Sequence, residues 1–230
     1  MRDGIVIPVD GPAGSGKSTL AKAIAERLGW DYLETGALYR AVGLVALDWG
    51  GDPDDPALAA RCAREMGFEC RKTPDGWRNF LDGRDVTQAL REERVSDAAS
   101  RVSAIPAVRE ALLGFQRAYR RRRGAVLDGR DIGTVVFPEA RLKFFLDADI
   151  EVRIGRRFQE LRAKGIPFDE GRLAEDIRAR DRRDRERAAA PLVPARDAVV
   201  IDTSQRSIDQ VLASMLEKVR QVYGEVIEVP

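Results

Sequence analysis

Apolar and polar positions along this chain change period in blocks that predict strands followed by helices. Residues 5–10, IVIPVD, form a short apolar run that ends at a glycine-rich turn, and residues 17–28 carry apolar side chains at helical spacing. A short strand at 31–34 leads into a helix at about 37–49, and the GGDPDDP segment at 50–56 breaks the chain. Pro8 has no backbone donor, which argues against a fully regular first strand.

The pattern changes between about residues 66 and 100. Three short segments, FECRK, WRNFL and RDV, are separated by turns at 74–76 and 82–83, which predicts a small antiparallel meander inserted into the chain. Helical spacing resumes from about 95 to 119 with an interruption at Pro106. The remaining expected elements are strands at 125–128, 142–147 and 198–202 and helices at about 150–164, 170–189 and 207–223. Near-continuous apolar strands that alternate with helices predict an α/β fold whose parallel sheet is covered on both faces.

Length and charge set limits on the kind of protein. The 230 residues, 44% of them hydrophobic, are enough for one domain or one domain with an insertion. A net charge of +1 gives no overall argument for a nucleic-acid or membrane partner. No apolar run approaches the roughly 20 residues of a membrane-spanning helix, and the first residues lack the pattern of a signal peptide. Cys62 and Cys70 form neither a CxxC pair nor a disulfide framework, which favours free thiols in the cytosol.

Histidine is absent, which excludes histidine-based triads, histidine general bases and the common zinc sites. Of the 39 basic residues 6 are lysine and 33 arginine. Arginine suits phosphate binding, although a genome-wide codon bias would produce the same excess. The arginine run at 120–123 is better explained as a solvated helix end than as an RNA contact, because no interleaved aromatic residues or larger basic stripe accompany it.

The sequence GPAGSGKS at 11–18 matches the pattern GxxxxGK[ST] directly after a predicted strand and before a predicted helix. In such a loop, backbone N–H groups surround the phosphates of a nucleoside triphosphate, Lys17 reaches the β- and γ-phosphates, and Ser18 can bind Mg²⁺. The alternative is a glycine-rich turn with an ordinary surface lysine. The predicted phosphate-binding residues are Gly11, Pro12, Ala13, Gly14, Ser15, Gly16, Lys17, Ser18 and Thr19.

Two further segments could hold the phosphoryl acceptor. ETGALYR at 34–40 places Thr35, Tyr39 and Arg40 at the opening of a helix, where an anion could bind; the alternative is a threonine N-cap and one surface arginine. DGRDIGT at 128–134 places Arg130 and Asp131 just past the carboxyl end of a strand, where open α/β sheets bind ligands. There the alternative is a turn with a local Asp–Arg pair.

The helix at about 170–189 carries a face that changes character. Leu173 and Ile177 begin an inward stripe that continues at three- and four-residue steps to Arg180, Asp184 and Arg187. Charged side chains facing a dry core would be costly, so this face meets a polar ligand or the helix runs out into solvent.

Taken together, GPAGSGKST, ETGALYRA, the inserted meander, AASRVSAIPAVREALL, LDGRDIGTVVFPEA and RDRRDRERAAAPLVPA resemble the bacterial cytidylate kinase family along nearly the whole chain. The resemblance implies a single P-loop NTPase domain over 1–230, with a five-stranded parallel sheet and helices on both faces. It also implies a nucleoside-monophosphate-binding insertion at about 66–100 and a short lid at about 153–168.

The resemblance also implies roles for individual residues. It places Ser100, Arg109 and Asp131 at the pyrimidine base. It places Arg40, Arg130 and Arg187 at the acceptor phosphate and Arg180 and Asp184 at the ribose. Arg153, Arg156 and Arg157 are expected to close over the transferred phosphoryl group, so that the expected catalytic set is Lys17, Arg130, Arg153 and Arg157.

The expected activity is transfer of the γ-phosphate of ATP to CMP, with dCMP as a second substrate and Mg²⁺ as cofactor. The family further implies a monomer. Departures from its common pattern are few: Glu34 and Thr35 stand where many members have another acid and serine, and Ser18 stands where some have glycine. The rival hypotheses are a P-loop kinase for shikimate, thymidylate or UMP, and a nucleotide-dependent switch or RNA-binding module without an acceptor.

Overall fold

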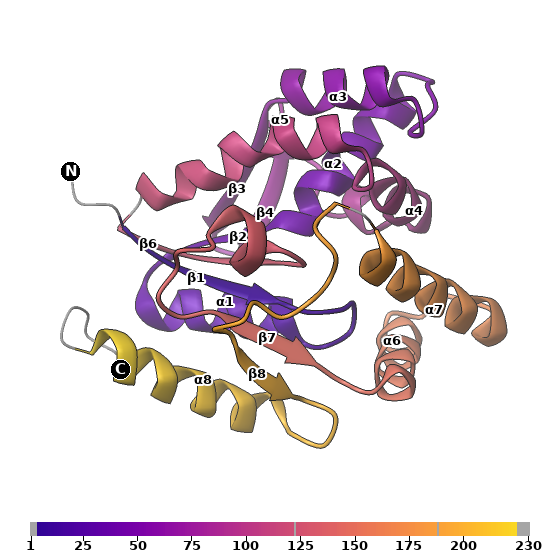
Figure 1. Cartoon of the computed structure of the whole chain (residues 1–230). Coiled ribbons are helices and arrows are strands. Elements are labelled where there is room, and N and C mark those ends of the chain that lie inside the picture. The colour runs from indigo at the N-terminus through magenta and orange to yellow at the C-terminus, as the bar shows by residue number, and fades with distance from the viewer. Residues whose placement is uncertain (1–3, 122, 188, 225–230) are drawn as a thin grey trace. The chain divides into compact units, whose positions relative to one another are not determined.

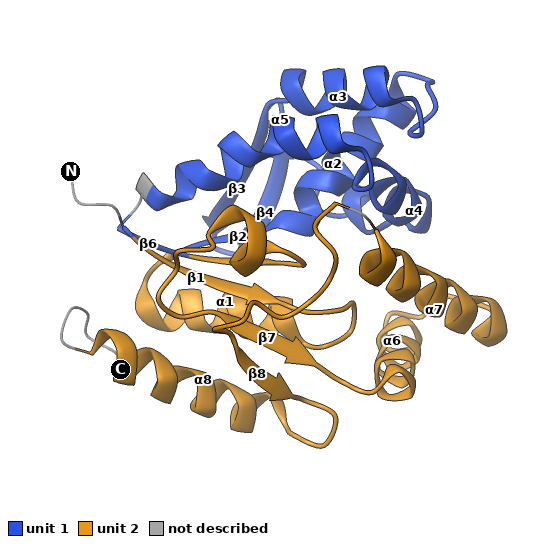
Figure 2. Ribbon diagram, in the orientation of Figure 1, with its two compact units in different colours: residues 1–4, 31–125 blue, residues 5–30, 126–230 orange. Residues whose placement is uncertain are grey.

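The computed structural model describes residues 4–121, 123–187 and 189–224, which divide into two compact units (Figure 2). Unit 1 comprises residues 1–4 and 31–125, and unit 2 comprises residues 5–30 and 126–230. Each unit is described by itself below.

Five strands form a parallel sheet in the order β2-β6-β1-β7-β8 (Figure 1). They are β1 Ile5–Asp10, β2 Asp31–Glu34, β6 Gly124–Gly129, β7 Phe144–Asp147 and β8 Val199–Asp202. β7 pairs in parallel with both of its neighbours, with Val9 opposite Phe144 and Phe144 opposite Val199. Every residue of β6 is buried, as expected for a strand covered on both faces. The predicted α/β architecture is confirmed, and Pro8 lies inside β1 without ending it.

Three helices of unit 2, α6, α7 and α8, begin where a polar side chain satisfies one of the first backbone N–H groups. Asp149 precedes α6 and accepts from the Glu151 amide, and Asp169 precedes α7 and accepts from the Arg172 amide. Ser207 forms a reciprocal capping box with Gln210 at the start of α8. The elements of unit 2 outside the sheet are α1 Lys17–Leu28, a π-helical turn η3 Ile132–Val136, α6 Ile150–Ala163, α7 Glu170–Glu186 and α8 Ile208–Tyr223.

Unit 1 contains the predicted meander as a three-stranded antiparallel sheet in the order β3-β4-β5. Phe68 pairs with Leu81, and Phe80 pairs with Asp85. The helix α2 packs along α4, and α3 packs along α5. The elements of this unit outside the large sheet are α2 Thr35–Asp48, α3 Pro56–Glu65, β3 Phe68–Thr73, β4 Gly76–Leu81, β5 Arg84–Asp85, η1 Ala89–Arg91, α4 Glu93–Val102, α5 Pro106–Arg117 and η2 Ala118–Arg121.

Several boundaries differ from the sequence-based ones. The helix α3 was not predicted, although Asp55 caps it and Pro56 stands at its first position. The expected helix at 95–119 is two helices, and Pro106 begins the second. The predicted helix at 170–189 ends at Glu186, and residue 188 lies outside the described residues. Of the arginine run at 120–123, residue 122 also lies outside them.

Both cysteines belong to unit 1 and are buried free thiols. Cys62 lies on α3 and Cys70 on β3. Burial raises the pKa of the Cys62 thiol, which keeps it protonated near neutral pH. Within the described ranges 4–121, 123–187 and 189–224, every helix is too short or too polar to cross a bilayer.

Candidate active site

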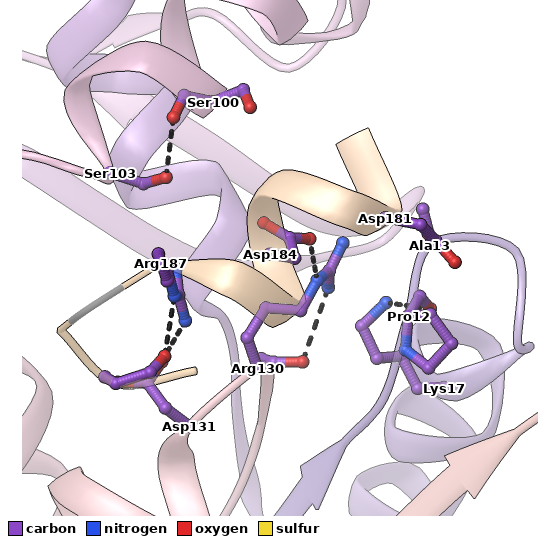
Figure 3. Close-up of polar contacts among 12 residues, drawn as sticks. Pro12, Ala13, Lys17, Ser100, Ser103, Arg130, Asp131, Asp181, Asp184 and Arg187 are labelled. Atoms are coloured by element: carbon purple, nitrogen blue, oxygen red, sulfur yellow. Dashed lines mark hydrogen bonds and ion pairs between the residues drawn. The ribbon is translucent and has the colours of Figure 1, made fainter. Parts of the chain in front are cut away.

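The glycine-rich loop between β1 and α1 has the geometry of a phosphate-binding loop. Gly11, Gly14 and Gly16 all adopt positive φ, of 152°, 77° and 85°. A side chain at Gly11 would also collide with β7, because a Cβ there would lie 2.1 Å from the carbonyl oxygen of Leu146. Lys17 begins α1, is 9% exposed and donates to the carbonyl oxygen of Pro12 at 3.1 Å (Figure 3). It is therefore a buried lysine of the loop and not an ordinary surface residue.

Two arginines of α6 hold the outer side of this loop. Arg153 Nη1 donates to the Ala13 carbonyl oxygen at 3.1 Å, and Arg156 Nη1 donates to the Gly14 carbonyl oxygen at 3.2 Å. Arg156 also donates to the hydroxyl of Thr203, which in turn donates to the Ser15 carbonyl oxygen at 3.0 Å. The carbonyl oxygens of Ala13, Gly14 and Ser15 thus accept hydrogen bonds from side chains outside the loop. The loop N–H groups are the donors that a bound phosphate would use.

Arg153 is a deeply buried charged side chain, at 2% exposure. It forms a two-pronged ion pair with Asp181 of α7, with one N–O distance of 2.9 Å, and it donates to the Ala148 carbonyl oxygen at 3.0 Å. A guanidinium with three acceptors is satisfied even though it is buried. Arg153 therefore links its own helix α6 to α7 and to the phosphate loop. The third predicted lid arginine, Arg157, is partly exposed and pairs with Glu160 on its own helix.

Arg130 and Asp184 form the first of two Arg–Asp pairs in unit 2. Arg130 Nε donates to Asp184 Oδ2 at 2.8 Å, and both side chains are largely buried (Figure 3). Burial pushes the pKa of Asp184 upward, but Arg130, Arg180 and Arg187 together hold it below its ordinary value. Burial likewise works against the charge of Arg130, but Asp184 raises its pKa overall. Both groups are therefore charged at neutral pH.

The second pair joins Asp131 to Arg187. Arg187 Nη2 lies 3.5 Å from Asp131 Oδ1, and its Nε donates to the Ala190 carbonyl oxygen at 2.6 Å. Asp131 is 5% exposed and stands at the start of the π-helical turn η3. The ion-pair partners of Arg130 and Asp131 thus come from in or next to α7, so the alternative of a local Asp–Arg pair is wrong. On this face of α7 and just after it, Asp184 is buried and paired with Arg130, and Arg187 lies beside Asp131, which contradicts the solvated alternative for these two side chains.

Unit 1 brings together the residues predicted around the second helix. Thr35 is buried and is the first residue of α2; the cap position is Glu34, so the threonine N-cap alternative is wrong. Arg40 donates to Glu34 at 2.8 Å, and its Nε is buried without a hydrogen-bond partner among the described residues. The Arg109 guanidinium lies 5.8 Å from the centre of the Tyr39 ring.

Ser100 lies on α4, close in the chain to the residue that binds Arg109. Arg109 donates to the Ser103 carbonyl oxygen at 3.4 Å. The Ser103 hydroxyl donates to the Ser100 carbonyl oxygen at 2.9 Å (Figure 3). The Ser100 hydroxyl is itself buried, and in the described part of the chain no group hydrogen-bonds to it. An orphaned buried hydroxyl is costly, so it favours a polar ligand at this position.

Three residues of the site were missed by sequence reasoning. Asp181 lies on the predicted charged stripe, four residues after Ile177, and the periodicity alone could have found it. Thr203 directly follows the last strand, at the sheet edge where ligands bind. Asp10 ends β1, and the sequence pattern predicts it only as a strand residue, because no local signal marks it as part of a site.

The donors near Ser18 fit a magnesium ion that travels with a nucleotide. Ser18 is half-buried in the first turn of α1 and offers a hard hydroxyl oxygen. Among the residues that the structure describes, no group of three or more acidic or cysteine side chains could enclose a metal ion. Mg²⁺ commonly takes only one or two protein ligands and completes its shell with phosphates and water, so a single hydroxyl is compatible with it.

A parallel sheet with a glycine-rich loop, a buried loop lysine and an arginine-rich surround defines a P-loop phosphotransferase. Residues 7–221 match the family described as cytidylate kinase. The chain is 46% identical over 221 residues to the cytidylate kinase of Aeromonas hydrophila, with 96% of each chain covered. It is 47% identical over 216 residues to that of Pseudomonas syringae pv. tomato, covering 93% of this chain and 94% of the relative. This chain belongs to the cytidylate kinase family and is a kinase.

Proposed function

We propose that this protein transfers the γ-phosphate of ATP to CMP, giving ADP and CDP, with dCMP as a second substrate. The observation that carries the proposal is the presence of two buried Arg–Asp pairs in the unit that also holds the phosphate loop. A switch protein needs the loop but has no use for a second anion site. A kinase needs both, because the acceptor is itself a phosphate.

The acceptor residues are proposed to act in three groups. Arg40, Arg130 and Arg187 bind the CMP phosphate, and Arg180 with Asp184 binds the ribose hydroxyls. Ser100, Arg109 and Asp131 recognise the base. Among residues 4–121, 123–187 and 189–224, the Ser100 hydroxyl and the Arg40 Nε have no hydrogen-bond partner, which supports these roles because each would gain a partner from the ligand. Thr35 and Tyr39 line the same part of unit 1 as Arg40 and Arg109.

The phosphoryl transfer requires no general base, because the attacking oxygen of CMP is already anionic. Lys17 and the loop N–H groups position the β- and γ-phosphates, and Ser18 is the protein ligand for Mg²⁺. The Ser18 hydroxyl would hold an Mg²⁺ ion bound with ATP, and the ion would supply positive charge that offsets the charge of the phosphates. We propose that Arg157 supplies positive charge to the transferred group, and that Arg153 and Arg156 belong to the same lid at about 153–168. The insertion at about 66–100 is proposed as the monophosphate-binding part.

The choice of base follows from polar groups that the wrong base would leave unpaired. Asp131 can accept from the exocyclic amine of cytosine, whereas uracil presents a carbonyl oxygen there. A buried acceptor left without a donor can reduce kcat/KM by about a thousandfold or more. We therefore expect UMP to be a poor substrate.

A coupled ADP-release assay with ATP and Mg²⁺ tests the function directly. CMP, dCMP, UMP, AMP, GMP, dTMP and shikimate are compared under identical conditions. The expected result is strong preference for CMP and dCMP. Preference for another acceptor would retain the kinase and discard the base assignment, and ATP hydrolysis that ignores every acceptor would favour the nucleotide-dependent switch.

The Asp184→Ala variant tests the ribose assignment. Asp184 is also the acceptor of Arg130, so the change removes a ribose contact and frees a phosphate-binding arginine at once. We expect the KM for CMP to rise about 10- to 100-fold, with a smaller rise for dCMP, since hydrogen bonds to charged groups contribute about 1.5–3 kcal/mol. Equal rises for the two substrates would place Asp184 away from the 2′-hydroxyl.

Two further properties are part of the proposal. The cytosol is proposed as the site of action, which the two free thiols support. A monomer is proposed as the working state, and sedimentation of the purified protein would test it.

A further inference from the structure

The carboxylate of Asp10 lies at the carboxyl end of β1, one residue before the phosphate loop, yet its contacts are with another segment. Oδ1 accepts from the Ile132 N–H at 2.9 Å, and Oδ2 accepts from the Gly133 N–H at 2.7 Å. These amides follow directly after Arg130 and Asp131. One carboxylate thus holds the backbone that carries two proposed CMP-binding side chains.

Asp131 would be expected to hold the second of those amides, that of Gly133, itself. It occupies the N-cap position of η3, and aspartate at such a position commonly accepts from the N–H groups two and three residues on. Here the Asp131 side chain makes no capping bond, and its carboxylate lies 3.5 Å from Arg187 instead. Asp10 takes the two amides nearest the start of the turn, and the Asp131 carboxylate is directed elsewhere.

The surroundings of Asp10 leave it little freedom. It is 4% exposed, and a Cβ at Gly133 would lie 3.3 Å from Asp10 Oδ2 and 3.2 Å from the Lys143 side chain. Lys143 is itself fixed, since its ammonium donates to Asp197 at 2.7 Å. A side chain at 133 would require the carboxylate or the lysine stem to shift, so glycine suits this close approach.

Keeping a carboxylate here has a cost. Burial raises the pKa of Asp10 to about 7, the nearby Asp131 adds to the rise, and the two amides and Arg130 act against it. If stability alone determined the residue at position 10, a neutral side chain would avoid the cost of burying a charge. The cost is consistent with a residue that is retained for what it positions.

We propose that Asp10 is a positioning residue for substrate selection: by capping η3 in place of Asp131, it keeps the Asp131 carboxylate directed at the base of the acceptor nucleotide. The proposal rests on the proposed function, in which Asp131 reads cytosine. Without Asp10, the Asp131 side chain turns back to cap the Gly133 amide and no longer meets the ligand.

The test compares Asp10→Ala and Asp10→Asn with the parent enzyme at pH 8, above the pKa of about 7, so that Asp10 is largely ionised. The readout is the ratio of kcat/KM for CMP to that for UMP, with KM for ATP measured alongside. We expect the ratio to fall at least about tenfold in Asp10→Ala and less in Asp10→Asn, which keeps one acceptor oxygen. The KM for ATP should change by less than about threefold.

The matched control is Asp202→Ala. Asp202 ends β8, another strand of the same sheet, and its carboxylate accepts from the Ser204 N–H at 2.8 Å, so this change also removes a carboxylate that binds a backbone N–H at a strand end. Its CMP/UMP ratio should equal that of the parent. In an Asp131→Ala background, Asp10→Ala should produce no further loss of the ratio, because both act through one side chain.

If Asp10→Ala folds poorly, a second measurement that does not depend on activity still tests the proposal. Hydrogen exchange of peptides spanning residues 130–136 should accelerate in Asp10→Asn, while peptides of α8 stay unchanged. The inference is overturned if both Asp10 variants keep the parent ratio, or if exchange at 130–136 is unaltered. A parent enzyme without CMP preference would instead refute the proposed function, so the two failures are distinguishable.

Discussion

Lys17→Ala is expected to lower kcat for CMP phosphorylation by about 10²–10³-fold, the usual effect of removing one charge-stabilising donor at a transition state. Lys17 is the buried cation of the phosphate loop, and in the free structure it is held against Pro12. It can therefore move to the β- and γ-phosphates when ATP binds. The KM for ATP should rise by a smaller factor, because the loop N–H groups still bind phosphate.

Lys22→Ala provides the control, because Lys22 lies on the same helix and is half-buried but is not part of the loop. It should retain turnover within about twofold of the parent. Thermal unfolding should show that Lys17→Ala is folded, since the lost bond to Pro12 contributes about 1 kcal/mol. Unchanged turnover of CMP by Lys17→Ala would falsify the assignment of 11–18 as the catalytic phosphate loop.

Arg153→Met is expected to have the largest effect on stability, a loss of about 3–5 kcal/mol in the free energy of unfolding. The change leaves the buried carboxylate of Asp181 without its partner and removes the bonds to the Ala13 and Ala148 carbonyl oxygens. Urea denaturation monitored by circular dichroism gives the difference from the midpoint and slope.

Arg178→Met is the matched control for that measurement. Arg178 and Glu151 also join α7 to α6, but both side chains are substantially exposed. Removing one partner of an exposed pair costs about 0–1 kcal/mol. A double variant, Arg153→Met with Asp181→Leu, should recover more than half of the loss, because the isolated charge is gone. If Arg153→Met and Arg178→Met lose equal stability, burial of the Arg153–Asp181 pair has no energetic consequence.

The local sequence pattern was sufficient to predict the elements that have strong hydrophobic periodicity or clear turn residues at their ends. The phosphate loop, the meander and all five strands of the large sheet were predicted from residue order, and the strand ends differ by no more than two residues. The helix α3 was missed because Asp55 and Pro56 were assigned to the preceding break. Its buried face is made mostly of alanine, which gives a weak apolar signal.

The site could be predicted residue by residue but not contact by contact. The sequence places Arg130 just past a strand end and Asp184 on the inward stripe of a helix, where a charged residue is unexpected. The two are 54 positions apart, so no local pattern predicts that they pair. Arg153 illustrates the same limit, because an arginine on a predicted lid helix gives no sign that it is buried against Asp181. Asp10 is the extreme case, since its acceptors serve amides 122 and 123 positions away.

The distribution of cysteine has a practical consequence for measuring how the enzyme moves during its cycle. Unit 2 carries no cysteine, and both thiols of unit 1 are buried, with Cys62 held protonated as well. A maleimide dye or spin label should therefore react slowly with the natural chain. The variant Ala213→Cys, at an exposed position on α8, would add a single fast-reacting handle to unit 2. Single-site spectroscopy during turnover then needs no cysteine-free background to be built first.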